Sequence, residues 1–361
     1  MKVVQIIPQF GLAGAEIMCE NLSYELMKLG NEVLVISLYN YHSSITERLE
    51  KNNIKVIYLN KHLGIDFSIA RKLYKILKKE RPDVVHTHLA ILKYVVPAAI
   101  LAGVKTRIHT IHNEAQKESR GLDKKFNKLA FKYFNVIPVA LSPKIQATIE
   151  REYQLNKDKI PIICNGINTQ SYKPKLNYSV DGKFKILNIA RFSEQKNHIG
   201  LLEAFRIFHS KYSNSILSII GEGEKRGEIE EFIRKNKLAD CVQLLGLKSE
   251  VANYLYETDI FVLASLYEGI PMTILEAMAA GVPIVSTEVG GVPDILTDNK
   301  NALLVETKPT GIANAFEKLY KNSVLREEIG RTALENSEKY SSAYMACQYL
   351  KVYRQQNFEE G

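Results

Sequence analysis

The sequence predicts an α/β protein built from two doubly wound parallel sheets. Its 361 residues are enough for two domains at roughly 100–200 residues each. Short apolar runs alternate with helical patterns along the chain, which is typical of strand–helix–strand units. After a polar stretch at residues 168–183 the alternation begins again. This restart favours two sheets of one kind over a single large sheet.

Six strands are expected in the first half, and helical spacing of apolar residues separates several of them. The strands lie at residues 3–8, 32–37, 55–59, 83–87, 107–111 and 136–141. The clearest helices lie at residues 15–29, 67–80 and 123–134. Parallel strands need crossover connections of this kind, so residues 1–172 are predicted to form a Rossmann-like domain.

The second half repeats the pattern and ends on a helix. Its strands are expected at residues 185–190, 215–220, 242–244, 260–264, 283–286 and 302–305. Residues 173–339 therefore predict a second Rossmann-like domain, facing the first across a cleft. Residues 340–356 form a Tyr-rich helix, with Tyr344, Tyr349, Leu350 and Tyr353 available for packing. We expect this closing segment, residues 340–361, to cross back to the first domain.

The composition argues against a membrane span, a disulfide framework and a metal site. The longest nearly apolar run, residues 94–104, has about half the roughly 20 residues that a spanning helix needs, and it contains Pro97. The first residues lack the hydrophobic length of a signal peptide. The four cysteines are scattered, without a C-x-x-C pair. A cytoplasmic protein is therefore expected.

Positive charge is concentrated in the first half. Residues 1–172 hold 25 Lys and Arg against 15 Asp and Glu, which gives +10, whereas the remainder carries −2. Such asymmetry indicates that the first half meets something anionic, such as a membrane face, a lipid pyrophosphate or nucleic acid. The chain has no aromatic–basic RNA motif, so we expect no nucleic-acid partner.

Candidate site residues of the first half follow its strands. The loop at residues 11–16 leads into a helix, and small residues such as Gly14 would let a backbone or an anion approach its free amides. The same loop fits a plain tight turn with Glu16 at the helix start. Two histidine pairs end later strands, at positions 86 and 88 and at positions 109 and 112. A structural role is the simpler interpretation for most of them, but His112 is placed to hold a substrate hydroxyl.

Two loops of the second half could hold phosphates. Arg191 and Lys196 follow the strand at residues 185–190. Arginine offers a rigid fork for phosphate oxygens and lysine a compact charge, so the pair suits a diphosphate. Gly290 and Gly291 follow a later strand and could add backbone amides, although a capped turn is equally consistent.

The strongest motif lies after the strand at residues 260–264. Gly269 and Pro271 mark a turn into a helix, and Pro271 fits the first turn of that helix. Glu268 precedes the helix, and Glu276 lies one to two turns inside it among apolar residues. A carboxylate in such surroundings needs a polar partner, which ribose or sugar hydroxyls could supply.

These motifs resemble the retaining, nucleotide-sugar-dependent glycosyltransferases of family 4, which have the two-domain GT-B architecture. The most specific element is the E-x7-E pattern at Glu268 and Glu276, and Arg191 and Lys196 stand in the expected earlier loop. The turn at residues 165–168 also resembles that of the family. Ala13 and Ala190 depart from it, because glycine is common at both places.

The resemblance implies roles for individual residues. Arg191 and Lys196 would bind the donor diphosphate, Glu276 the ribose, and Glu268 and His112 would approach the transferred sugar. The expected donor-binding residues are Gly14, Arg191, Lys196, Glu268, Gly269, Ile270, Pro271 and Glu276. The expected acceptor-binding residues are Gly14, Glu16, His88 and His112. The expected catalytic residues are His112, Arg191, Lys196 and Glu268. Such enzymes usually need no metal or other cofactor, and the sequence has no D-x-D pair.

The expected reaction is transfer of a hexosyl or N-acetylhexosaminyl group from a nucleoside-diphosphate sugar, with UDP the expected nucleotide, to an acceptor alcohol. A lipid-linked saccharide in cell-envelope polysaccharide synthesis is the preferred acceptor. The alternatives are a sugar-nucleotide epimerase or a phosphorylase on the same scaffold, or a non-catalytic sugar-nucleotide binder.

A membrane surface is a further expected partner. Residues 117–132 interleave six basic residues with Leu122, Phe126, Leu129 and Phe131, which suits a helix at the inner face of an anionic membrane. A solvated surface helix is the alternative.

Overall fold

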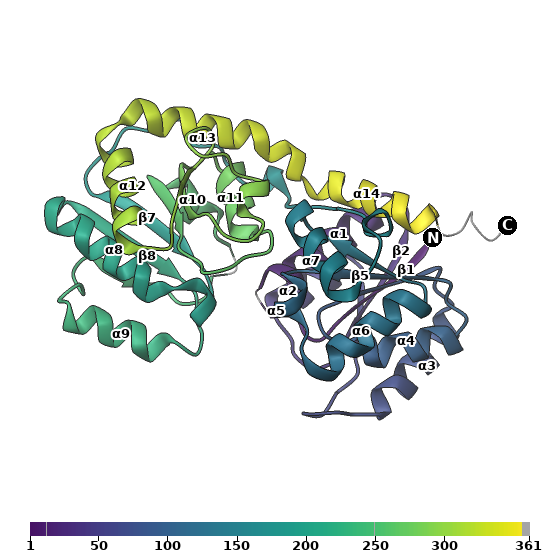
Figure 1. Cartoon of the computed structure of the whole chain (residues 1–361). Coiled ribbons are helices and arrows are strands. Elements are labelled where there is room, and N and C mark those ends of the chain that lie inside the picture. The colour runs from purple at the N-terminus through teal and green to yellow at the C-terminus, as the bar shows by residue number, and fades with distance from the viewer. Residues whose placement is uncertain (12, 249, 356–361) are drawn as a thin grey trace. The chain divides into compact units, whose positions relative to one another are not determined.

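The computed structural model describes residues 1–11, 13–248 and 250–355. The chain divides into two compact units (Figure 1). Unit 1 comprises residues 1–167 and 342–361, and unit 2 comprises residues 168–341. The junctions fall within five residues of the boundaries expected at residues 172 and 339. The polar linker at residues 168–183 belongs to unit 2, where Tyr178 is buried and its hydroxyl donates to the Gly281 carbonyl at 2.9 Å.

Unit 1 contains a six-stranded, wholly parallel sheet in the order β3-β2-β1-β4-β5-β6. Its strands are β1 (Lys2–Ile7), β2 (Glu32–Ser37), β3 (Lys55–Tyr58), β4 (Val84–His88), β5 (Thr106–Ile111) and β6 (Val136–Ala140). The central strands β2, β1 and β4 are almost completely buried, with only the first residue of β1 and β2 partly or fully exposed and all of β4 buried, because helices cover both faces of a doubly wound sheet. The strand order confirms the predicted Rossmann-like topology.

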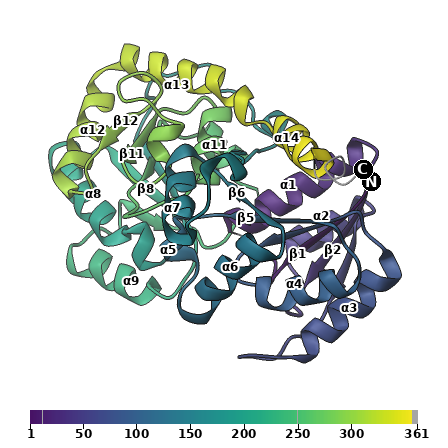
Figure 2. The same ribbon diagram turned by 45° about the vertical axis from the view of Figure 1, so that its right-hand side comes forward.

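The helices of unit 1 form two groups. They are α1 (Gly14–Lys28), α2 (Ser44–Lys51), α3 (Ser68–Glu80), α4 (Leu92–Leu101), α5 (Ala115–Glu118), α6 (Gly121–Tyr133), α7 (Pro143–Tyr153) and α14 (Ser342–Gln355). The helix α1 packs against α2 and α14, whereas α4 packs against α3 and α6 (Figure 2). A core including Leu34, Leu73 and Val95 lies beneath α3 and α4.

Unit 2 repeats the same architecture. Its parallel sheet has the order β12-β11-β10-β7-β8-β9. The strands are β7 (Phe184–Ile189), β8 (Ser215–Ile220), β9 (Val242–Leu244), β10 (Ile260–Leu263), β11 (Ile284–Thr287) and β12 (Leu303–Val305). The helices are α8 (His198–Lys211), α9 (Arg226–Lys235), α10 (Ala252–Tyr256), α11 (Met272–Ala279), α12 (Pro309–Lys321) and α13 (Ser323–Ser337). Each of the twelve predicted strands is therefore present in the two sheets.

The closing helix α14 packs on the first sheet. Tyr349 and Tyr353 are completely buried, whereas Tyr344 is exposed. The Tyr353 hydroxyl lies 2.7 Å from His86 Nδ1, and the Tyr349 hydroxyl lies 2.7 Å from Thr110 Oγ1. Gln356, the last residue of the expected helix, and residues 357–361 lie outside the described residues.

Two local expectations are wrong. The basic segment at residues 117–132 is not one helix, because α5 ends at Glu118, the backbone is extended at Arg120, and α6 begins at Gly121 with a φ of +55°. One of its expected interfacial residues, Phe131, packs inward against Tyr153. Pro271 precedes α11 as its N-cap instead of occupying the first turn.

Candidate active site

Apart from Gly14, which belongs to unit 1, the expected donor residues follow the two strands at which the strand order of unit 2 reverses. The neighbouring strands β7 and β10 continue into loops whose following helices serve opposite sides of the sheet. Open α/β sheets bind ligands beyond the carboxyl ends of the strands at such a switch point. Arg191 and Lys196 follow β7, and Glu268 to Pro271 follow β10, so the fold brings both loops to this edge.

The loop after β7 holds its two cations differently. Lys196 closes a short 3₁₀ turn, and the left-handed Asn197 then caps α8 by accepting a hydrogen bond from Gly200 N at 3.3 Å. The Lys196 side chain is only 19% exposed. The Arg191 side chain is 69% exposed and its guanidinium lies 3.1 Å from the exposed Glu224 carboxylate. Because exposed ion pairs contribute little stability, Arg191 can exchange this partner for a ligand at small cost.

Glu268 is buried beside Lys196. Its Oε1 lies 2.5 Å from Lys196 Nζ and accepts a second hydrogen bond from Ser265 Oγ at 2.6 Å. Gln195 joins the two loops, since its Nε2 donates to the Tyr267 carbonyl at 2.8 Å. Lys196, which is predicted to bind the diphosphate, therefore forms an ion pair with Glu268, which is predicted to face the sugar.

Gly290 and Gly291 let the next loop approach Glu268 closely. Gly290 has a φ of +54°, and an added Cβ would lie 1.8 Å from the Glu268 carbonyl oxygen. The Gly291 amide donates to the same carbonyl at 3.3 Å. A side chain at position 290 would displace the backbone that carries Glu268, so these glycines support the turn. The capped-turn alternative describes them better than direct phosphate contact.

The buried carboxyl of Glu276 lies in the middle of α11. It is 6% exposed, and burial raises its pKa to about 7. A hydrogen bond with Tyr172 partly offsets this effect of burial. At the start of α11, the N–H groups of Met272 and Thr273 have no hydrogen-bond acceptor among the described residues. Such a helix end attracts anions.

In unit 1, the first loop meets the helix α1 at Gly14. Glu16 lies in the first turn of α1, and its side chain is 7% exposed. A Cβ added at Gly11 would lie 3.7 Å from Glu16 Oε1, so the loop folds back over this carboxyl group. Leu12 of the predicted loop lies outside the described residues.

The histidines of β4 and of the loop after β5 form a connected chain with β1. Gln5 Oε1 accepts a hydrogen bond from His88 Nε2 at 2.9 Å, and His88 Nδ1 lies 3.0 Å from His112 Nε2. Because neutral His88 already donates through Nε2, its Nδ1 must accept from His112. The Nδ1 atom of His112, which has no protein partner in the described part of the chain, is then left with its lone pair.

His88 does not match its expected role as an acceptor ligand. It is completely buried, and both its ring nitrogens are occupied. It orients His112 instead. Burial lowers the pKa of His112 to about 3 and holds that of His88 well below its usual range, so both rings are neutral near pH 7.

A second group of buried polar side chains, Glu118, His109 and His86, lies in the same unit. Glu118 Oε2 accepts hydrogen bonds from the backbone N–H groups of His112, at 2.5 Å, and Asn113, at 3.0 Å, and thereby fixes the loop after β5. Burial raises the Glu118 pKa to about 8 and lowers the His109 pKa to about 3. His86, between Tyr353 and Thr110, completes the layer.

Two family models match the sequence of this chain. Residues 12–171 match the model of Glycosyltransferase Family 4, and residues 172–336 match that of Glycosyl transferases group 1. Over 277 residues, 70% of each chain, the protein is 30% identical to the UDP-Gal:alpha-D-GlcNAc-diphosphoundecaprenol alpha-1,3-galactosyltransferase of Escherichia coli. The chain belongs to the family 4 glycosyltransferases. It is therefore a glycosyl-transferring enzyme.

Other glycosyltransferases are similar over most of the chain. The N-acetyl-alpha-D-glucosaminyl L-malate synthase of Bacillus anthracis is 27% identical over 307 residues, which are 80% of this chain and 78% of that protein. The crystal structure of Anabaena Alr3699/HepE in complex with UDP and glucose superposes with a TM-score of 0.86 at 16% identity, covering 98% of this chain and 99% of that one. The similarity to the Anabaena structure shows that this chain has the GT-B fold.

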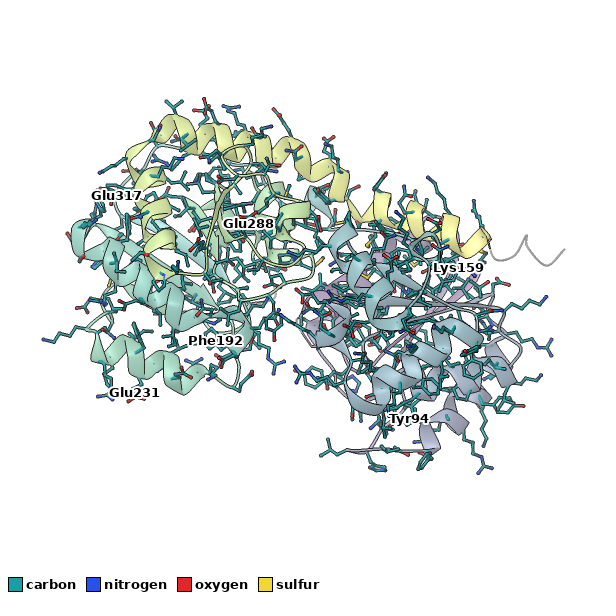
Figure 3. All side chains as sticks on the ribbon, in the orientation of Figure 1. Tyr94, Lys159, Phe192, Glu231, Glu288 and Glu317 are labelled. Carbon is teal, nitrogen blue, oxygen red and sulfur yellow. The ribbon has the colours of Figure 1, made fainter. Side chains whose placement is uncertain are left out.

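Sequence reasoning missed several residues that shape the site of this glycosyltransferase. Gly221 and Gly223 follow β8, and a Cβ on either would collide with the backbone of the Arg191 loop, beside Phe192 (Figure 3). Ser265 and Tyr172 hold the two site carboxylates. The G-x-G spacing was a readable signal. The contacts of Ser265 and Tyr172 depend on the tertiary fold and left no signal in the sequence.

Neither a membrane span nor a metal cluster is found in the described part of this glycosyltransferase. Over those residues no helix combines the length and apolar character needed to cross a bilayer. The same residues contain no group of three or more His, Cys, Asp or Glu side chains arranged to hold a metal ion.

Proposed function

We propose that this glycosyltransferase moves a hexosyl or N-acetylhexosaminyl group from a UDP-linked sugar to an alcohol of a lipid-linked saccharide, with retention of anomeric configuration. The main support for this proposal is the switch point of unit 2, where Arg191 and Lys196 lie on one side and the start of α11 lies on the other. This edge combines a cationic fork, a partly buried ammonium and free helix amides, which together match a diphosphate.

The nucleoside part of the donor is assigned to α11. Glu276 is a buried carboxyl group with a neighbouring hydroxyl from Tyr172, so it can accept hydrogen bonds from a ribose diol. UDP is preferred because the similar galactosyltransferase is named for UDP-Gal and the similar Anabaena structure contains UDP.

Departure of the nucleotide is the step that these groups would promote. Negative charge develops on the diphosphate as the glycosidic bond breaks, and Arg191, Lys196 and the α11 amides would stabilise it. This charge balance requires no metal or other cofactor. Glu268 already binds Lys196 and Ser265, which disfavours it as a free nucleophile. We therefore favour attack of the acceptor on the face that the phosphate leaves, with the phosphate taking the acceptor proton.

The first unit would bind the acceptor. Neutral His112 presents an Nδ1 lone pair that can accept a hydrogen bond from a sugar hydroxyl. Gly14 and Glu16 would line the acceptor side. Because the similar E. coli enzyme is named for a diphosphoundecaprenol-linked sugar, we place the reaction in cell-envelope polysaccharide synthesis at the inner face of the membrane.

Thermal unfolding in the presence of nucleotides tests the donor assignment. UDP or its sugars at 100 times the dissociation constant should add about 2.7 kcal/mol to the free energy of unfolding. Arg191→Ala should remove most of this shift, whereas the matched control Arg206→Ala, at an exposed pair with Glu203, should keep it. A folded protein that responds to no nucleotide, or an Arg191→Ala variant that responds like the wild type, would refute the assignment.

A further inference from the structure

The connection between β3 and α3 exposes three large apolar side chains within five residues. Leu63, Ile65 and Phe67 are 92%, 62% and 85% exposed. In Figures 1 and 2 the segment leading into α3 extends away from the body of its unit. Contiguous apolar exposure of this kind marks an interaction surface more often than isolated exposed residues do.

Polar groups of the same segment hold it in this arrangement. Lys61 Nζ donates to the His62 carbonyl at 2.8 Å and to the Gly64 carbonyl at 2.5 Å. Asp66 accepts hydrogen bonds from His62 N at 3.2 Å and from Ser68 Oγ at 2.6 Å. The polar side chains therefore fold inward to organise the loop, and the apolar ones are left on its outside.

Contacts with α4 connect this loop to the first turn of α6. The Asp66 amide donates to the hydroxyl of Tyr94 at 3.2 Å. Tyr94 is labelled in Figure 3. Lys93 Nζ lies over the Tyr94 ring and pairs with Asp123 of α6 at 2.9 Å. Leu122, the neighbour of Asp123, is 76% exposed. We call Leu63, Ile65, Phe67 and Leu122 the apolar tip.

Cations accompany the apolar tip. Arg120 and Lys125 flank Leu122 and are exposed, and within the described residues neither forms an ion pair. Residues 1–172 as a whole carry a net charge of +10. Apolar side chains next to unpaired cations complement a bilayer whose headgroups are anionic and whose interior is apolar.

We propose that the apolar tip inserts into the interface of an anionic lipid bilayer while Arg120 and Lys125 contact the headgroups. The proposal rests on the proposed function, since it names the surface from which a lipid-linked acceptor would be taken. The loops after β3 and β5 lie at the carboxyl edge of the first sheet, as do Gly14 and His112. This proposed surface also replaces the expected interfacial helix at residues 117–132, because the structure divides that segment between α5 and α6.

Cosedimentation with lipid vesicles tests the proposal. The protein should bind vesicles of phosphatidylcholine and phosphatidylglycerol but not of phosphatidylcholine alone, and added salt should weaken binding. The double variant Leu63→Ser/Phe67→Ser should weaken binding at least about tenfold. Arg120→Gln and Lys125→Gln should each weaken it about fivefold, since a basic residue contributes about 1 kcal/mol near an anionic membrane. Leu176→Ser, at a leucine of unit 2 that is 76% exposed, should bind as the wild type does.

Three results would overturn the proposal. The first is a wild-type protein that does not bind anionic vesicles at low salt, and the second is a Leu63→Ser/Phe67→Ser variant that binds like the wild type. The third is a double variant that loses self-association in light scattering while keeping vesicle binding, because the tip would then be a protein interface. Stabilisation of each variant by UDP, measured in parallel, shows whether the donor assignment stands independently of the membrane result.

Discussion

At the scale of single residues, the ion pair between Lys196 and Glu268 is the most informative contact of the site. Both residues could be predicted from their motifs, but their pairing could not, because it depends on β7 and β10 being neighbours in the sheet. The same limit applies to Tyr172, which follows the turn at residues 165–168 and reaches Glu276 more than a hundred positions later. Motif spacing predicts which residues belong to a site, and the fold determines which of them bond.

Substitution at this pair should separate stability from catalysis. Lys196→Met leaves the buried Glu268 carboxylate without its cation and should lower the free energy of unfolding by about 3 kcal/mol. The double variant Lys196→Met/Glu268→Gln removes both charges and should regain most of that stability. Because both variants lack the ammonium group, turnover should remain about 10²–10³ below wild type in each.

Chemical denaturation and sugar-transfer rates on the same preparations check this prediction. The control is Lys235→Met, whose exposed pair with Glu231 should contribute less than about 1 kcal/mol. If the double variant recovered both stability and turnover, the role of Lys196 would be purely structural.

At the scale of elements, the strands were the most predictable part of the molecule. A buried parallel strand is a short apolar run between turns, and that signal is local. The division between α5 and α6 was less predictable, because Arg120 adopts an extended backbone that its sequence does not require. The return of α14 to the first domain was expected, but its packing on β4 and β5 and its role in enclosing a layer of histidines were not.

That histidine layer on β4 and β5 should make unit 1 sensitive to acid. Burial keeps the pKa values of His86, His88, His109 and His112 below the unfolded value of 6.5, so the unfolded chain binds more protons between about pH 3 and 6.5. The stability that these residues contribute is complete above pH 6.5 and is lost as the pH falls. At pH 5.5 each of these four histidines should lower the free energy of unfolding by about 1.4 kcal/mol.

Glu118 acts in the opposite direction. Because its folded pKa is raised to about 8, the folded protein binds more protons above pH 4.5, and stability declines as the pH rises toward 8. Urea unfolding of the protein should therefore show greatest stability near pH 6.5, with a steep acid side and a shallow alkaline side. Glu118→Gln should flatten the alkaline side and, because the extra folded-state proton is bound from about pH 4.5 upward, make the acid side steeper between pH 4.5 and 6.5. A stability that does not change between pH 5 and 6.5 would contradict the neutral histidine layer.

At the scale of the whole molecule, the alternating pattern and its restart were sufficient to predict two doubly wound sheets, and both sheets have a doubly wound strand order. Charge asymmetry predicts an anionic partner for the first half. The apolar tip could not be found in this way, since Leu63, Ile65 and Phe67 look like ordinary core residues until the fold leaves them exposed.

The measurement that tests the central proposal most directly is the anomeric configuration of the transferred sugar. The protein would be incubated with the UDP-sugar that stabilises it most and with polyprenyl-diphosphate-linked N-acetylglucosamine, and the product examined by mass spectrometry and proton NMR. We predict a product heavier by one sugar residue, joined with the same configuration as in the donor, and a rate about 10²–10³ lower for Lys196→Met/Glu268→Gln. An inverted linkage, or a wild-type rate in that variant, would contradict the proposal.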